Sequence, residues 1–166
     1  LDSAMLLKQD NINDFYFVMC GADRGVYDFI NQSIKDDNIS DKVCTLPLIS
    51  NFCLKSLYEK CFAVIMPTDT GPTNLPLYEA MFFKKPIFYS KNISDDAKIK
   101  EIIIPIDVKD PNSFVAELKD LNKENILKKV EIGNDYYKKF CNEEVALNLY
   151  INIISEFKAI LSLWKK

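Results

Sequence analysis

The residues best suited to chemistry lie in the segment 66–81, where a turn containing glycine and proline follows an apolar run. The apolar run at 62–65 predicts a buried strand, and the residues after Asn74 have helical character. Backbone N–H groups at such a helix start have no partner within the helix and can hold a phosphate. Glu79 lies one turn further on, on the same helix face as Leu75. The pattern predicts a site for a ligand with a diphosphate at one end and a hydroxylated ring beside it.

Short apolar strands alternate with helices along the whole chain. The periodicity predicts strands at 15–20, 43–46, 62–66, 86–89 and 102–106. It predicts helices at 1–10, 26–35, from 50 or 51, 74–83, 95–100, 110–121, 123–140 and 142–164, the last with an apolar stripe typical of a packed helix. Such alternation indicates βαβ units, and therefore an α/β, Rossmann-like parallel sheet with helices on both faces.

Ligand sites in sheets of this kind lie at the carboxyl ends of the strands. Gly21, Pro47 and the turn at 67–74 each follow a predicted strand, so we expect three loops to converge on one crevice. Gly21 either lets a ligand approach the backbone closely or simply ends its strand. Arg24 could reach a phosphate, although a surface arginine is the more ordinary interpretation.

Composition excludes several classes of protein. The 166 residues suffice for one domain, and no apolar run reaches the roughly 18 residues of a membrane span. The net charge of −3 argues against a nucleic-acid binder that works by releasing counterions. Because the chain has no histidine, it can form neither a serine–histidine nor a cysteine–histidine catalytic pair, nor a histidine-ligated metal site.

The five cysteines are odd in number and form no C-x-x-C pair. Cys20 and Cys44 lie within apolar strand-like runs, so we expect buried, inert thiols in a reducing compartment rather than disulfides or metal ligands. The sequence starts at Leu1 within a helical pattern, from which we expect a fragment of a longer polypeptide.

The run Pro-Thr-x-x-Gly-Pro-Thr-Asn-Leu-Pro-x-x-Glu-Ala at 67–80 resembles the nucleotide-sugar site of group 1 (family 4) retaining glycosyltransferases. The pattern Ser-Asn-x-x-Leu-x-x-Leu-Tyr at 50–58 and the strand end at 17–21 resemble the same family, and the similarity covers roughly residues 4–160. The resemblance implies that 1–166 is the C-terminal, donor-binding half of a GT-B enzyme. The N-terminal acceptor domain and the first strand of the sheet would then be absent.

The resemblance also implies roles for individual residues. Backbone N–H groups of Thr73, Asn74 and Leu75 would bind the donor diphosphate, although Thr and Asn are also ordinary helix caps. Glu79 would accept hydrogen bonds from the ribose hydroxyls, and its plainer interpretation is a solvated or ion-paired helix glutamate.

The loops near the donor would include Gly21, Gly71 and Pro72, and the base would rest against Leu48 and Ile49, which could equally be ordinary loop residues. Relatives of this fold generally work without a metal, and Asp69 with its threonine neighbours offers too few oxygens for one. We therefore expect no metal and no cofactor, with the nucleotide sugar as a substrate.

One position departs from the family pattern, because the first glutamate of the usual E-x7-E pair falls at Gly71. The basic residues that clamp the diphosphate would lie upstream of position 1, and no residue here stands out as catalytic. We expect a cytoplasmic fragment that binds a nucleotide-diphosphate sugar but is inactive alone. The full-length enzyme would lie peripherally at the inner membrane face and would transfer the sugar with retention to a glycan or lipid-linked acceptor of a surface polysaccharide. The alternatives are a non-catalytic binding or scaffold domain, or a sugar-nucleotide epimerase or hydrolase of the same fold.

Overall fold

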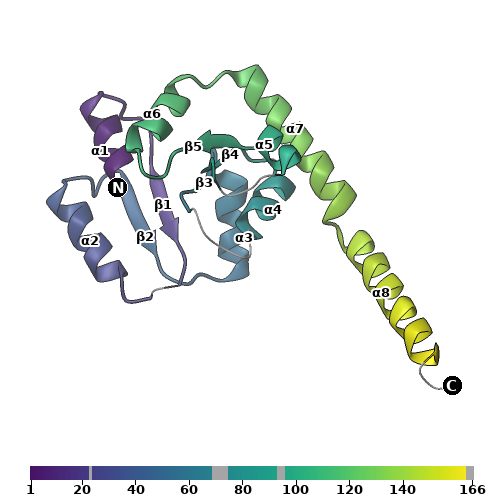
Figure 1. Ribbon diagram of the computed structural model, residues 1–166. Coiled ribbons are helices and arrows are strands. Elements are labelled where there is room, and N and C mark those ends of the chain that lie inside the picture. The colour runs from purple at the N-terminus through teal and green to yellow at the C-terminus, as the bar shows by residue number, and fades with distance from the viewer. Residues whose placement is uncertain (23, 69–74, 93–95, 164–166) are drawn as a thin grey trace.

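The computed structural model describes residues 1–22, 24–68, 75–92 and 96–163 (Figure 1). The strands within these ranges are β1 (Phe17–Cys20), β2 (Val43–Leu46), β3 (Val64–Met66), β4 (Ile87–Ser90) and β5 (Ile104–Ile106). The helices are α1 (Asp2–Gln9), α2 (Tyr27–Asp36), α3 (Asn51–Lys60), α4 (Leu75–Phe82), α5 (Ala97–Ile102), α6 (Pro111–Lys119), α7 (Lys123–Phe140) and α8 (Glu143–Leu163).

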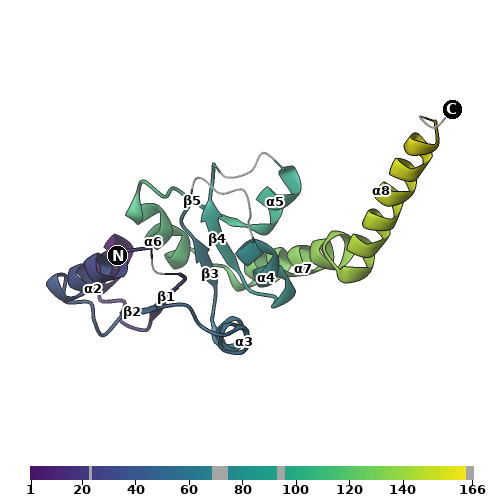
Figure 2. The same ribbon diagram turned by 90° about the horizontal axis from the view of Figure 1, so that it is seen from below.

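All strand pairs are parallel, and helices flank the strands on both sides, which confirms the predicted α/β fold (Figure 2). β1 pairs with β2, and β4 lies between β3 and β5. The sequence predicted one sheet. In the described residues, no ladder joins β1 to β3, so the strands form a pair and a triplet instead.

Local signals set the helix ends where the sequence predicted them. Ser50 Oγ accepts a hydrogen bond from the Cys53 N–H at 3.3 Å and begins α3. The Asp110 carboxylate does the same for α6, which has proline at its first position. Asn142 Oδ1 accepts from the Val145 N–H at 2.9 Å at the start of α8.

The core has one apolar layer on each face of the β3–β5 triplet. β4 is buried on both faces, since none of its four residues, Ile87 to Ser90, is more than 2% exposed. One layer lies under α3, α4 and α7, and the other lies under α1 and α6. The Tyr89 hydroxyl is buried, and among the described residues it has no hydrogen-bond partner.

Helix α7 holds α4 in place. The buried Asn134 side chain of α7 donates to the Met81 carbonyl of α4 at 3.2 Å. One turn of α7 also approaches α4 and α5 closely at Gly133, where an added Cβ would lie 3.0 Å from Ile102 Cγ2 and 3.4 Å from Met81 Cγ. Contacts with α7 therefore fix the position of α4, the helix that carries Glu79.

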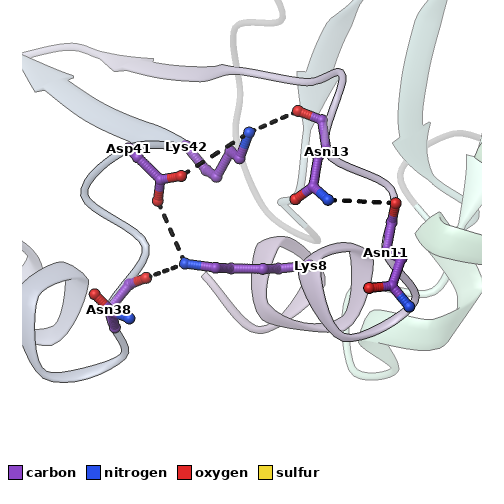
Figure 3. A network of polar contacts seen from close by, with 6 residues as sticks. All are labelled: Lys8, Asn11, Asn13, Asn38, Asp41 and Lys42. Atoms are coloured by element: carbon purple, nitrogen blue, oxygen red, sulfur yellow. Dashed lines mark hydrogen bonds and ion pairs between the residues drawn. The ribbon is translucent and has the colours of Figure 1, made fainter.

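A polar network fastens α1 to the β1–β2 pair (Figure 3). Lys8 Nζ donates to the Asn38 carbonyl at 2.5 Å and to Asp41 Oδ1 at 3.4 Å. Lys42 Nζ donates to the Asn13 carbonyl at 2.6 Å, next to the start of β1. These contacts join the end of α1 to the segments that lead into both strands.

The last helix, α8, extends away from the rest of the molecule in both views (Figures 1 and 2). Its predicted packed stripe is therefore wrong for the described residues, because Leu149, Ile153, Phe157 and Ile160 are each at least 50% exposed. Ala146 and Trp164 complete the predicted stripe. Ala146 is exposed as well, and Trp164 lies outside the described residues. The periodicity that marks an apolar face carries no information about what covers it.

The cysteines partly differ from expectation. All five thiols are free, as predicted, but Cys20 is exposed and Cys44 is only half-buried. Among the described residues, β1 pairs with a strand along one edge only, and this leaves Cys20 accessible. None of the helices among the described residues is both long and apolar enough to cross a bilayer.

Candidate functional site

Three strands end at the edge where the sequence places the site. β1 runs into Gly21, β2 into Pro47 and β3 into Pro67. The Tyr27 hydroxyl lies 2.8 Å from the Gly21 carbonyl oxygen and 2.9 Å from the Leu46 carbonyl oxygen. One phenol thus fixes the carboxyl ends of β1 and β2 relative to each other.

The backbone at Gly21 is open on its outer side. Gly21 is exposed, and a Cβ added there would have no atom within 4 Å. Packing within the described residues therefore does not require glycine at this position. The missing side chain leaves room for a molecule that approaches the end of β1.

Glu79 lies on α4, one turn after its start, and is half-buried. The Tyr58 hydroxyl of α3 donates a hydrogen bond to Glu79 Oε2 at 2.7 Å. A carboxylate has about four acceptor positions, so one phenol does not saturate it. Tyr58 therefore orients Glu79 and leaves it with capacity for a further donor, such as a hydroxyl group.

The surroundings of Tyr58 keep it neutral and rigid. It is 8% exposed, and its ring stacks on that of Phe83 with centroids 5.2 Å apart and planes 3° from parallel. Burial raises the pKa of the Tyr58 phenol strongly, and the hydrogen bond to the Glu79 carboxylate raises it further. The phenol is therefore a permanent donor to Glu79 at physiological pH.

Cys20, at the end of β1, has a small effect on this pair. The thiol of Cys20 contributes electrostatically to the raised pKa of Tyr58, although less than burial and Glu79 do. Burial also raises the pKa of Cys20 itself, so the thiol is the dominant form near neutral pH. The contact that joins α3 and α4 here is the hydrogen bond between Tyr58 and Glu79.

The remaining predicted residues have mixed placements. Leu75 begins α4 and is 64% exposed, and Arg24 is exposed. Leu48 is 82% exposed and Ile49 is half-buried in the loop after β2. Five residues considered for the site lie outside the described residues: Asp69, Gly71, Pro72, Thr73 and Asn74.

Sequence reasoning missed two contacts near these strand ends. The Tyr58–Glu79 hydrogen bond joins residues 21 positions apart, so no local sequence pattern predicts it. Lys91 and Asp107 follow β4 and β5 and form an ion pair at 2.7 Å. The hydrogen bond from Lys91 lowers the pKa of the Asp107 carboxyl, helped by the Lys109 N–H.

A family model for glycosyl transferases group 1 matches residues 1–138. A search of curated proteins found no sequence match. Among solved structures, the C-terminal domain of the group 1 glycosyl transferase LpcC from Francisella tularensis is 20% identical with a TM-score of 0.68, over 83% of this chain and 75% of that domain.

Two larger enzymes have the same fold in part. Sucrose-phosphate synthase from Thermosynechococcus elongatus is 16% identical with a TM-score of 0.71, over 96% of this chain and 49% of that protein. A TarM mutant from S. aureus, determined in complex with fondaparinux, alpha-GlcNAc-glycerol and UDP, is 17% identical with a TM-score of 0.63. The match covers 90% of this chain and 30% of TarM, so the chain spans half or less of these two enzymes.

Proposed function

Because the chain belongs to the group 1 glycosyltransferases, we propose that it binds the nucleotide-diphosphate sugar that such an enzyme uses as donor. The observation that carries the proposal is Glu79, which Tyr58 holds one turn after the start of α4. Glu79 accepts hydrogen bonds from the two ribose hydroxyls, which suit an ionised carboxylate.

The diphosphate lies at the start of α4 in this proposal. Unpaired N–H groups of the first helical turn and the positive end of the helix dipole both favour a doubly charged anion. We assign the N–H groups of Thr73, Asn74 and Leu75 to the diphosphate, with Gly71 and Pro72 in the loop beside it. When the bond to the sugar breaks, the same groups stabilise the charge on the departing nucleotide.

The base rests against the loop after β2, at Leu48 and Ile49. Leu48 is 82% exposed, so it offers an apolar surface that a stacked base would cover. Gly21 leaves the neighbouring strand end accessible. The proposal uses no resident metal or cofactor, and the nucleotide sugar is a substrate.

The complete enzyme consists of this half and an upstream half that binds the acceptor. Support comes from sucrose-phosphate synthase and TarM, of which this chain spans 49% and 30%. The full-length enzyme transfers a hexose with retention to a glycan or lipid-linked acceptor in surface polysaccharide synthesis. It acts in the cytoplasm, peripherally at the inner face of the membrane, which agrees with five unpaired thiols.

Calorimetric titration of the chain with UDP, GDP and ADP tests donor binding. We expect dissociation constants in the high micromolar to millimolar range, because the basic residues that clamp the diphosphate would lie upstream of position 1. Replacing Glu79→Ala removes hydrogen bonds to a charged group and should weaken binding about tenfold, or ~1.4 kcal/mol. Equal affinity of the variant would remove Glu79 from the site.

A matched control is Glu59→Ala, since Glu59 is exposed on α3 and forms a surface ion pair with Lys55 at 3.6 Å. This variant should bind nucleotides like the unmodified chain, because exposed ion pairs contribute little. A loss in both variants would indicate a general effect of the substitutions on the fold rather than a contact with ribose, because removing negative charge should by itself favour an anionic ligand.

Gly71 stands where the family usually has the first glutamate of its pair, and this departure favours two alternative functions. A non-catalytic domain would bind nucleotides but transfer no sugar when joined to its upstream half. An epimerase or hydrolase would convert the sugar nucleotide without any acceptor. An assay of the joined protein, with and without acceptor, separates the three cases.

A further inference from the structure

We propose that Tyr27 is a positioning residue for base recognition: its hydroxyl fixes the loop after β2, and the backbone of that loop then discriminates between nucleotide bases. This role rests on the donor site proposed above and names what makes that site selective. Tyr27 acts through the loop residues Leu48 and Ile49 and does not itself touch the nucleotide.

The Tyr27 hydroxyl lies between the ends of two strands. β1 and β2 run side by side and end at the same edge, from which the chain continues to α2 and α3 (Figure 1). The backbone bond at this end is long, since the Gly21 N–H donates to the Leu46 carbonyl at 3.4 Å. The Tyr27 hydroxyl lies 2.8 Å from the Gly21 carbonyl oxygen and 2.9 Å from the Leu46 carbonyl oxygen. It therefore holds together two strand ends that the backbone alone joins weakly.

The Leu46 carbonyl belongs to the peptide unit that leads into Pro47. A peptide unit is planar, so a carbonyl that is held in one direction fixes the plane of the whole unit. The proline ring then holds φ of Pro47 at about −65°. These two consecutive restraints set the direction in which the chain continues to Leu48.

The loop is held at its far end as well. Ser50 Oγ accepts the hydrogen bond from the Cys53 N–H at 3.3 Å, which fixes Ser50 at the start of α3. Only Leu48 and Ile49 lie between Pro47 and this cap. A segment this short has few conformations while both of its ends are fixed, and releasing one end restores backbone freedom to both residues.

The two loop residues offer backbone groups to a ligand. Among the described residues, the N–H and carbonyl groups of Leu48 and Ile49 have no hydrogen-bond partner. Bases differ in the donors and acceptors along their edges. Rigid backbone groups bond to a matching base and leave a mismatched base with unpaired polar groups, whereas a mobile loop adapts to any base. Selectivity therefore depends on how firmly the loop is held.

A second hydroxyl joins the same helix to the same strand and provides a control. Thr45 Oγ1 of β2 donates to Asn31 Oδ1 of α2 at 2.7 Å. Asn31 lies one turn after Tyr27 on the same face of α2. The Thr45 contact is made by a side chain within the strand and does not involve the carbonyl that leads into the loop. Its removal should loosen α2 and leave the loop unchanged.

Calorimetric titration with UDP, GDP and ADP tests this role in the unmodified chain, Tyr27→Phe and Thr45→Val. The unmodified chain should prefer one of the three nucleotides by about tenfold, the contribution of one hydrogen bond. Tyr27→Phe should reduce this preference to about twofold or less by weakening the preferred nucleotide. Thr45→Val should keep the preference. Both variants should lower the melting temperature by about 3 °C, so the two differ in selectivity rather than in stability.

Backbone NMR relaxation of the free chain gives a second readout that needs no nucleotide. The order parameters of the Leu48 and Ile49 amides should be about 0.85 in the unmodified chain and in Thr45→Val. In Tyr27→Phe they should fall below about 0.6, the range of a flexible backbone. Unchanged order parameters in Tyr27→Phe would overturn the proposal.

The binding data decide in the same way. A preference that Tyr27→Phe retains would remove Tyr27 from base recognition. A loss of preference in both variants would assign the effect to the packing of α2 rather than to the Tyr27 hydroxyl. Equal affinity of the unmodified chain for all three nucleotides would overturn the role of Tyr27 and leave the donor site standing. The absence of any nucleotide binding would overturn both.

Discussion

The Tyr58 hydroxyl and the Glu79 carboxylate lie 2.7 Å apart across the contact between α3 and α4. The bond joins the helix that follows β2 to the helix that follows β3, so two consecutive βα units share one polar contact. Because Tyr58 is buried and stacked on Phe83, the direction of the bond is set by the core rather than by solvent. Glu79 is thereby oriented before any ligand arrives.

Replacing Tyr58→Phe keeps the ring stack and deletes the donor to Glu79. We expect a loss of unfolding free energy of about 1 kcal/mol and a three- to tenfold weaker binding of UDP, roughly 1 kcal/mol. The variant should also lose preference for UDP over its 2′,3′-dideoxy analogue, measured by calorimetry. A variant that keeps this preference would show that Tyr58 supports the fold but does not orient Glu79 toward ribose.

The Tyr89→Phe substitution is a matched comparison with the opposite expectation. Tyr89 is buried like Tyr58, at 0% against 8% exposed, but its hydroxyl has no hydrogen-bond partner among the described residues. Deleting an unsatisfied buried hydroxyl should leave stability unchanged or raise it by about 1 kcal/mol. Urea unfolding measures the difference. A loss comparable to that of Tyr58→Phe would reveal a partner for Tyr89.

The ion pair between Lys91 and Asp107 should appear in the pH dependence of stability. The hydrogen bond from Lys91 lowers the pKa of Asp107 in the folded state, so the native state binds this proton less readily than the unfolded chain does. The stabilisation is therefore present above the ordinary aspartate pKa of about 3.9 and is lost as the pH falls through the lower folded value.

Thermal melts of the unmodified chain and of Asp107→Asn between pH 7 and pH 2 measure this contribution. The melting temperatures should differ at pH 7 and converge in the acid range. Asp135→Asn, a change at an exposed position of α7, should follow the unmodified chain at every pH. A gap between Asp107→Asn and the unmodified chain that is constant with pH would exclude the ionised carboxylate as its cause.

Gly133 sets the distance between α7 and the helices it covers. An added Cβ would lie 3.0 Å from the buried Ile102 side chain, so a branched residue cannot fit without displacing α7 or α5. Gly133→Val should therefore destabilise the fold by about 2 kcal/mol through overpacking, as measured by urea unfolding. Glu131→Val, at an exposed position of the same helix, should cost only about 0.5 kcal/mol. Equal losses would assign the effect to helix propensity alone.

Features set by neighbouring residues could be predicted from the sequence. Ser50, Asp110 and Asn142 begin their helices as predicted, because a cap depends on a few adjacent residues. The alternation of strands and helices predicted the α/β fold, because each element shows its own periodicity. The position of Glu79 on the first turns of α4 followed in the same way.

Features that depend on distant residues could not be predicted. The partner of Glu79 lies on another helix, and its place is set by how α3 packs on α4. The exposure of Cys20 depends on which strands pair with β1, and an apolar run is the same at an edge as in an interior. The diphosphate residues Thr73 and Asn74 lie outside the described residues, so their assignment stays a prediction.

The exposed helix α8 determines how this chain behaves in concentrated solution. Leu147 and Leu149 are 57% and 60% exposed, and residues two apart on a helix point to nearly opposite sides. Apolar side chains are therefore exposed to water around much of the helix, and each Å² of this apolar surface costs about 25 cal/mol of free energy. Light scattering should rise steeply with the concentration of the 166-residue chain. A polypeptide that stops at Asn142 should stay clear and unfold at the same temperature, and so suits spectroscopy better.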